Sequence, residues 1–215
     1  MNYLQNLWNA LDLGSMRDTL LRVVSVLICL ILHETCHGVA AFFLGDPTAK
    51  RNHRLSLNPL RHIDWFGLAA MVLTGVGWAK PVPVNPNYFK RPKLGMAITA
   101  LAGPVSNLLL ALWLLLGVRV LIDGAASLAL ITFLLDTAIL SLGLGVFNLI
   151  PIPPLDGSKV LAALLPDKQY RLLMRYERFG MLIIMLLVVF GALSGVVGPI
   201  IAEIFRIFCR IVGLV

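Results

Sequence analysis

The sequence predicts an all-α polytopic membrane protein, a bundle of about four to six transmembrane helices. Two observations indicate this fold class. Hydrophobic residues make up 59% and charged residues 13% of the 215 residues, and the mean hydropathy is +0.88, far from the soluble average. The apolar residues also gather in long runs that suit membrane spans. Because little chain is left outside these runs, we expect one integral-membrane domain covering residues 1–215.

Four long apolar runs are the expected spans. They cover residues 23–44, 94–118, 125–150 and 181–197. A further run, at residues 66–76, is too short to cross a bilayer. The first long run lacks the basic flank and the cleavage site of a signal peptide, so we expect it to be retained. The two ends of the chain have amphipathic patterns and are expected to cross, lie on or pack within the membrane.

The basic residues indicate the orientation in the membrane. Residues 45–93 contain eight Lys or Arg, residues 119–124 contain one, and residues 151–180 contain five. The positive-inside rule places the two basic segments on the cytoplasmic side of the inner membrane. The net charge of the chain is +7. Its basic residues lie between the apolar runs and form no nucleic-acid-binding motif. We therefore expect the lipid bilayer, and not nucleic acid, as the surroundings of the chain.

The segment between the first two long spans has a different pattern. RLSLNPLRHI and WAKPVPVNP show the alternation and the prolines of short edge strands. Backbone at membrane depth that is not helical must be buried in protein or line a cavity. We therefore expect a small membrane-associated β-sheet or hairpin here, dipping into the cytoplasmic face.

A polar pentapeptide, HETCH, interrupts the first span at residues 33–37. On a helix His33 and His37 lie one turn apart on one face, so both imidazoles can bind one zinc ion. Glu34 is then placed to take a proton from water activated by the zinc. The composition of the chain gives a chance HExxH a probability of about one in a thousand. The alternative is a structural histidine pair with Glu34 in a buried ion pair, but ionisable residues within a membrane usually mark functional sites.

A third metal ligand is expected at the cytoplasmic end of another span. The third long run ends in FNLIPIPPLDG, where Asp156 offers a carboxylate. The prolines force the chain extended and Gly157 permits a turn, so Asp156 can point back toward the bundle. LDG alone is a weak signal, and its alternative is an ordinary polar turn.

Together these motifs resemble the site-2 protease family of intramembrane zinc metalloproteases. That family combines an HExxH on one core helix with an N-x-x-P-x-P-x-L-D-G-like motif on another, which here contains Asn148, Pro151, Pro153, Leu155, Asp156 and Gly157. The resemblance extends through GDPTAKRNHRLSLNPLRHID, GWAKPVPVNP and LAGPVSNLLLAL and includes no PDZ-like domain. The chain looks like a minimal member, with its catalytic core at residues 20–160.

The resemblance implies a zinc metalloendopeptidase that cleaves a transmembrane segment of another protein near the cytoplasmic face. One zinc per chain would be bound by His33, His37 and Asp156. Glu34 would be the general base, and Asn148 would stabilise the oxyanion. The alternative for Asn148 is a cap at the end of a proline-broken helix. The resemblance names no substrate and assigns no oligomeric state.

A helical substrate must unwind before cleavage, and an exposed strand edge can bind the extended form. The candidate edge is TGVGWAKPVPV, residues 74–84, although a purely structural hairpin is the alternative. A further candidate lies in AGPVSN of the second span, where helix packing is the alternative role. The expected substrate-binding residues are Gly75, Gly77, Trp78, Pro83, Val84 and Asn107.

Several other polar residues are expected to lie away from the metal. His53 and His62 have no metal-ligand spacing, and the three cysteines, among them Cys36, match neither a disulfide nor a metal pattern. Asp136 lies about 18 Å of helix before Asn148, and it either pairs with Arg119 or lines a water path.

Two other functions are compatible with polar groups inside the membrane. One is a transporter or channel with a His, Glu and Asp ion path. It does not require a glutamate next to a histidine pair. The other is a catalytically silent zinc-bound regulator, which would normally have lost Glu34 or a ligand.

Overall fold

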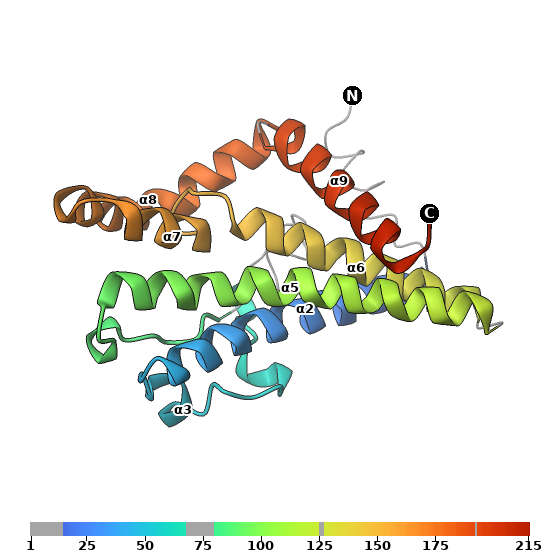
Figure 1. Ribbon diagram of the computed structural model, residues 1–215, viewed down its shortest axis with the longest axis horizontal. Helices are drawn as coiled ribbons and strands as arrows, with labels where there is room; N and C mark the ends of the chain where they lie inside the picture. The colour runs from blue at the N-terminus through green and yellow to red at the C-terminus, as the bar shows by residue number, and fades with distance from the viewer. Residues whose placement is uncertain (1–14, 68–79, 125–126, 192) are drawn as a thin grey trace.

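The computed structural model describes residues 15–67, 80–124, 127–191 and 193–215, which form helices joined by short turns and extended segments. Three long helices run side by side along the molecule (Figure 1): α2 (Ser15–Phe43), α5 (Pro92–Asp123) and α6 (Leu128–Asn148). Shorter helices follow: α7 (Asp156–Leu164), α8 (Asp167–Val189) and α9 (Ser194–Val212). The helix α3 (Thr48–Arg51) and the 3₁₀ turns η1 (Pro59–Arg61) and η2 (Pro86–Tyr88) lie between α2 and α5.

Three helices of the described chain are long and apolar enough to cross a membrane. They are Asp18–Phe43, Pro92–Asp123 and Leu128–Asn148, which correspond to the first three predicted runs. The fourth run, residues 181–197, is divided, because α8 ends at Val189 and α9 begins at Ser194. Gly191 between them has a φ of 68°, a left-handed conformation that ends helices. The described residues therefore contain three candidate spans, fewer than the four to six expected.

The expected β-sheet between the first two spans is not found in the described part of residues 45–93. The two proline-containing segments are joined by one backbone hydrogen bond, from Lys80 N–H to His62 O at 2.9 Å. Pro81 and Pro83 have no N–H to extend this contact into a ladder. Residues 68–79, which would form the centre of the hairpin, lie outside the described residues.

Helix α5 is the centre of the bundle, because it packs against α2, α6 and α7. Helix α9 lies obliquely across α5 and α6 (Figure 1). The small side chains of Ala111 and Ala138 allow close helix contact in the core between these helices. That core is formed by Ala111, Leu115, Ala138, Leu142 and Cys209. Large apolar side chains such as Trp113, which is 68% exposed, cover the outside of the spans, as expected for a surface that faces lipid.

Candidate metal centre

The two histidines of HETCH meet on the buried face of α2. His33 and His37 are one helical turn apart and are 3% and 8% exposed. Their Nε2 atoms lie 3.0 Å from each other, with the two rings perpendicular. Side chains at positions i and i+4 share a helix face, so the expected geometry follows directly from the helix period.

Asp156 completes the cluster from α7. Its Oδ2 lies 3.1 Å from the Nε2 of each histidine, and the residue is 7% exposed. It stands in the first turn of α7, where the helix dipole favours a negative charge. Burial alone would raise the pKa of Asp156, but hydrogen bonds from the histidines and the charge of Lys159 hold it below its ordinary value. The carboxylate is thus kept in the ionised form that binds a metal.

Gly157 brings Asp156 to this position. A Cβ at residue 157 would lie 2.1 Å from Leu149 O and 2.7 Å from Ile150 O. The first turn of α7 therefore packs directly on the backbone that leaves α6. A glycine is needed here because the neighbouring atoms are backbone atoms that cannot move aside.

The three ligand atoms suit a tetrahedral zinc ion. Zinc bonds of about 2.0–2.1 Å to nitrogen and oxygen give ligand atoms about 3.3 Å apart. The observed separations of 3.0–3.1 Å require only a small expansion to admit the ion. Two imidazoles and one carboxylate also leave a fourth position open, as catalytic zinc sites do.

Partners on α5 orient both imidazole rings through their Nδ1 atoms. His37 Nδ1 lies 2.7 Å from Thr99 O, and His33 Nδ1 lies 3.1 Å from the Asn107 amide nitrogen. A metal-bound His33 would carry a proton on Nδ1 and needs an acceptor, so the Asn107 amide should present its oxygen there instead. The oxygen as assigned has no hydrogen-bond partner, which agrees with this exchange of amide atoms.

Helix α5 also makes room for the rings. A Cβ at Gly103 would lie 2.5 Å from His37 Nε2 and 2.7 Å from His33 Cε1. The absence of a side chain at this position lets α5 contact the ligand pair directly. Pro104 follows, and its missing N–H removes a helical hydrogen bond in the same turn.

A cavity of about 390 Å³ opens beside the cluster. His33, Glu34 and His37 line one side, and Val82 and Val84 line another. Glu34 Oε2 accepts a hydrogen bond from the backbone N–H of Val82 at 2.9 Å. Glu34 is therefore on the cavity wall with the metal-ligating groups, where a proton carrier would be needed.

Asn148 also lines the cavity, and its side-chain amide donates to Leu144 O at 2.9 Å. Two further charged residues on the wall were not singled out from the sequence. Lys159 Nζ lies 3.6 Å from Asp156 Oδ1, three residues along α7, and Glu177 reaches the wall from α8. The i, i+3 spacing of Asp156 and Lys159 is the signal that could have found the first of these. Nothing in the local sequence indicates the second.

The predicted substrate-binding residues lie in different environments. Gly75, Gly77 and Trp78 fall outside the described residues. Val84 is on the cavity wall, with Pro83 next to it in the chain. Asn107 is completely buried against His33.

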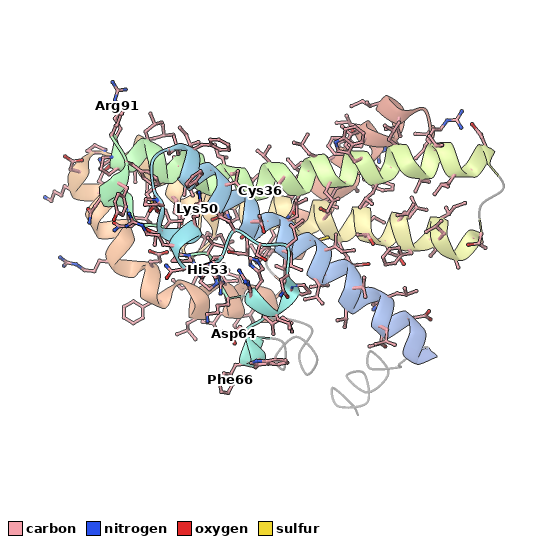
Figure 2. All side chains as sticks on the ribbon, turned by 90° about the horizontal axis from the view of Figure 1, so that it is seen from below. Cys36, Lys50, His53, Asp64, Phe66 and Arg91 are labelled. Atoms are coloured by element: carbon pink, nitrogen blue, oxygen red, sulfur yellow. The ribbon has the colours of Figure 1, made fainter. Side chains whose placement is uncertain are left out.

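The polar residues expected to lie away from the metal do so. His53 lies in the loop after α3, near Lys50, at the end of the bundle where α5 also begins (Figure 2). His62 is buried, and its Nε2 lies 2.6 Å from Ser56 O. Cys36 is half-buried on α2 and is not one of the three metal-ligating groups.

The structure confirms neither of the two roles expected for Asp136. It is exposed on α6, and Arg119 instead pairs with Asp123 at 2.5 Å. The exposed carboxylate of Asp136 is therefore not the partner of Arg119.

The fold and the site together define a class of protein. A buried His, His and Asp cluster beside a glutamate, set between apolar helices, is the centre of a metal-dependent hydrolase held in a membrane. Comparison with known proteins specifies this class further. The family model of Peptidase family M50 matches residues 118–191.

Two relatives match most of the chain. It is 37% identical over 183 residues to "Putative zinc metalloprotease YwhC" of Bacillus subtilis, covering 82% of this chain and 84% of that protein. It is 31% identical over 185 residues to "Putative zinc metalloprotease Rip2" of Mycolicibacterium smegmatis, covering 81% and 69%. No solved structure matches the chain significantly. The chain belongs to peptidase family M50, the site-2 protease family, and is a zinc metalloprotease.

Proposed function

We propose that this protein cleaves a transmembrane segment of another membrane protein, within the membrane and near its cytoplasmic face. The observation that carries the proposal is the convergence of His33, His37 and Asp156 beside Glu34. His33 lies ten residues before the end of α2 at Phe43, about 15 Å along the helix. This depth supports cleavage inside the bilayer. The same domain, residues 1–215, would contain the whole reaction.

In this proposal His33, His37 and Asp156 bind one zinc ion, and Glu34 moves the proton. A zinc ion held by these residues would act as a Lewis acid, which would lower the pKa of bound water and polarise the scissile carbonyl. Glu34 accepts the proton from the attacking water and delivers it to the leaving amine nitrogen. Asn148 donates one N–H to Leu144 O, and the second N–H of its amide is available to the oxyanion.

The substrate is proposed to bind in an extended form along residues 82–84. Within the described residues 80–85 most amide donors are already used: Lys80 N–H binds His62 O, Val82 N–H binds Glu34, and Asn85 N–H binds Asp46. Pro81 and Pro83 have no donor. Val84, on the cavity wall, has no backbone hydrogen bond to another described residue, and we propose that its N–H and C=O pair with an unwound substrate.

The first test is metal analysis of the detergent-purified protein. Wild type is expected to hold about one zinc per chain, and Asp156→Ala and the double change His33→Ala/His37→Ala are expected to hold none. Glu34→Gln should keep the zinc and lose cleavage of co-expressed single-span membrane proteins. A wild type that stays metal-free after reloading with zinc would contradict the proposal.

A further inference from the structure

We propose that Arg54 is a positioning residue for the reaction. Its guanidinium holds the backbone of residues 80 and 81, so that the N–H of Val82 fixes the carboxylate of Glu34. The inference rests on the proposed function, in which Glu34 carries the proton. It assigns a role to a side chain that contacts neither the metal-ligating atoms nor the cavity.

Arg54 is buried and binds the backbone carbonyls of residues 80 and 81. The residue is 8% exposed, and its Nη2 donates to Lys80 O at 2.6 Å and to Pro81 O at 3.1 Å. Its Nε has no hydrogen-bond partner, and no carboxylate pairs with it in the described part of the chain. A buried cation without a counter-charge is costly. The two carbonyls are the acceptors that keep it there, so it is bound to this segment specifically.

Val82 is the one residue among 81–83 that has an amide hydrogen, because prolines flank it on both sides. That hydrogen binds Glu34 Oε2 at 2.9 Å, across 48 residues of sequence. A glutamate side chain has three rotatable bonds, and this contact restricts it while leaving Oε1 to act on water. The position of the Val82 backbone amide thus determines the position of the Glu34 carboxylate.

Arg54 is itself attached to the helix that carries Glu34. The link is Ser56, two residues further along the chain, whose O accepts from Thr35 Oγ1 of α2 at 3.3 Å. The backbone N–H of Arg54 donates to Ala49 O of α3 at 2.9 Å, which holds Arg54 beside the short helix that follows α2. Thr35 follows Glu34 directly on α2. The contacts therefore form a closed path from α2 through Arg54 to residues 80–82 and back to Glu34. Loss of the guanidinium would break this path between residue 54 and residues 80–81.

The path can be tested by amide hydrogen exchange of the zinc-loaded protein in detergent. In residues 80–84 Pro81 and Pro83 contribute no amide, so a peptide over this stretch reports on three amides, including Val82. We expect Arg54→Met to exchange the Val82 amide at least about tenfold faster than wild type. Arg54→Lys, which keeps one charged donor group, should restore part of the protection. The matched control is Arg61→Met, because Arg61 is exposed and donates to His53 O instead.

Kinetics with a membrane protein that wild type cleaves supply the second readout. Arg54→Met is expected to lower kcat at least about tenfold with KM within about twofold and zinc content unchanged. Val82→Pro removes the amide hydrogen and leaves Arg54 in place, and it should lower kcat in the same way if Arg54→Met does not fold. A variant with zinc bound, kcat retained and Val82 protected would overturn the role of Arg54 alone. Absence of cleavage by wild type would instead overturn the proposed function, and with it the role of Arg54 in positioning Glu34 for the reaction.

Discussion

Gly103 decides whether the two histidines can lie against α5. A Cβ there would come within 2.5 Å of His37 and 2.7 Å of His33, closer than any real contact. We expect Gly103→Ala to displace the rings and to weaken zinc binding about 10- to 100-fold, the range found when the orientation of a ligand is disturbed. Zinc competition with a chelator measures this directly.

Gly117→Ala is the matched control, because Gly117 lies on the same helix and a Cβ there meets nothing within 4 Å. Alanine at a helical position where the Cβ has open space should leave the protein as stable or slightly more stable, by roughly 0.5–1 kcal/mol. Equal zinc affinity in Gly103→Ala and Gly117→Ala would show that α5 does not constrain the ligands.

Substitutions at Asn107 can distinguish a role in zinc binding from a role in substrate binding. Because it contacts His33 Nδ1 at 3.1 Å, Asn107→Ala should weaken zinc binding about tenfold or more. Asn107→Asp, which keeps an acceptor for the His33 N–H, should lose less. Chelator competition is again the measurement. Unchanged zinc affinity together with a raised KM would support the substrate-binding role expected from the sequence.

The sequence indicates those site residues that stand in a recognisable local pattern. His33 and His37 are four apart, so the helix period alone brings them together. Asp156 could be found because prolines and a glycine mark where its helix can turn back. Arg54 and Val82 could not, because each meets a partner that is distant in sequence and each contact involves backbone atoms. A backbone donor or acceptor has no signature in the sequence.

At the scale of elements, hydropathy predicts helices better than it predicts their ends. The first three runs correspond to α2, α5 and α6, but α2 begins at Ser15, eight residues before its run, and α5 ends at Asp123, five residues after its run. The run at residues 181–197 is equally apolar, but a turn at Gly191 divides it. Average hydropathy does not detect one glycine with a positive φ. The alternating segments near residues 54 and 80 likewise predict strands, although their prolines leave too few donors for a sheet.

The junction of α6 and α7 supports a prediction about packing. A Cβ at Gly157 would overlap the backbone carbonyl of Leu149, so Gly157→Ala must shift α7 and Asp156 with it. We expect a loss of stability of about 1–3 kcal/mol, typical of overpacking, and a fall in zinc content. Thermal unfolding with metal analysis measures both effects.

Gly143→Ala, on α6, is the control for this variant. The nearest side-chain atom to a Cβ there is 3.8 Å away, an ordinary contact, so neither stability nor zinc content should fall. If Gly157→Ala retained full zinc and an unchanged melting temperature, the close approach of α7 to the end of α6 would not be what positions Asp156.

At the scale of the molecule, the distribution of charge and the position of the site agree. The helix ends nearest His37 and Asp156 adjoin the basic segments, residues 45–93 and 151–180. Lys50 and Arg91 both lie at this end of the bundle (Figure 2). Asp123, at the opposite end of α5, lies in the connection that has one basic residue.

This polarity predicts the orientation of the whole chain. Cysteines introduced one at a time at His53, Arg91 and Asp123 of a variant without Cys29, Cys36 and Cys209 can be labelled in intact cells with a membrane-impermeant thiol reagent. Position 123 should react, whereas positions 53 and 91 should react only after the membrane is permeabilised, because the positive-inside rule retains their flanks in the cytoplasm. The reverse pattern would place the metal centre near the outer face. Zinc chemistry would then be unaffected, but the proposed cleavage near the cytoplasmic face would be excluded.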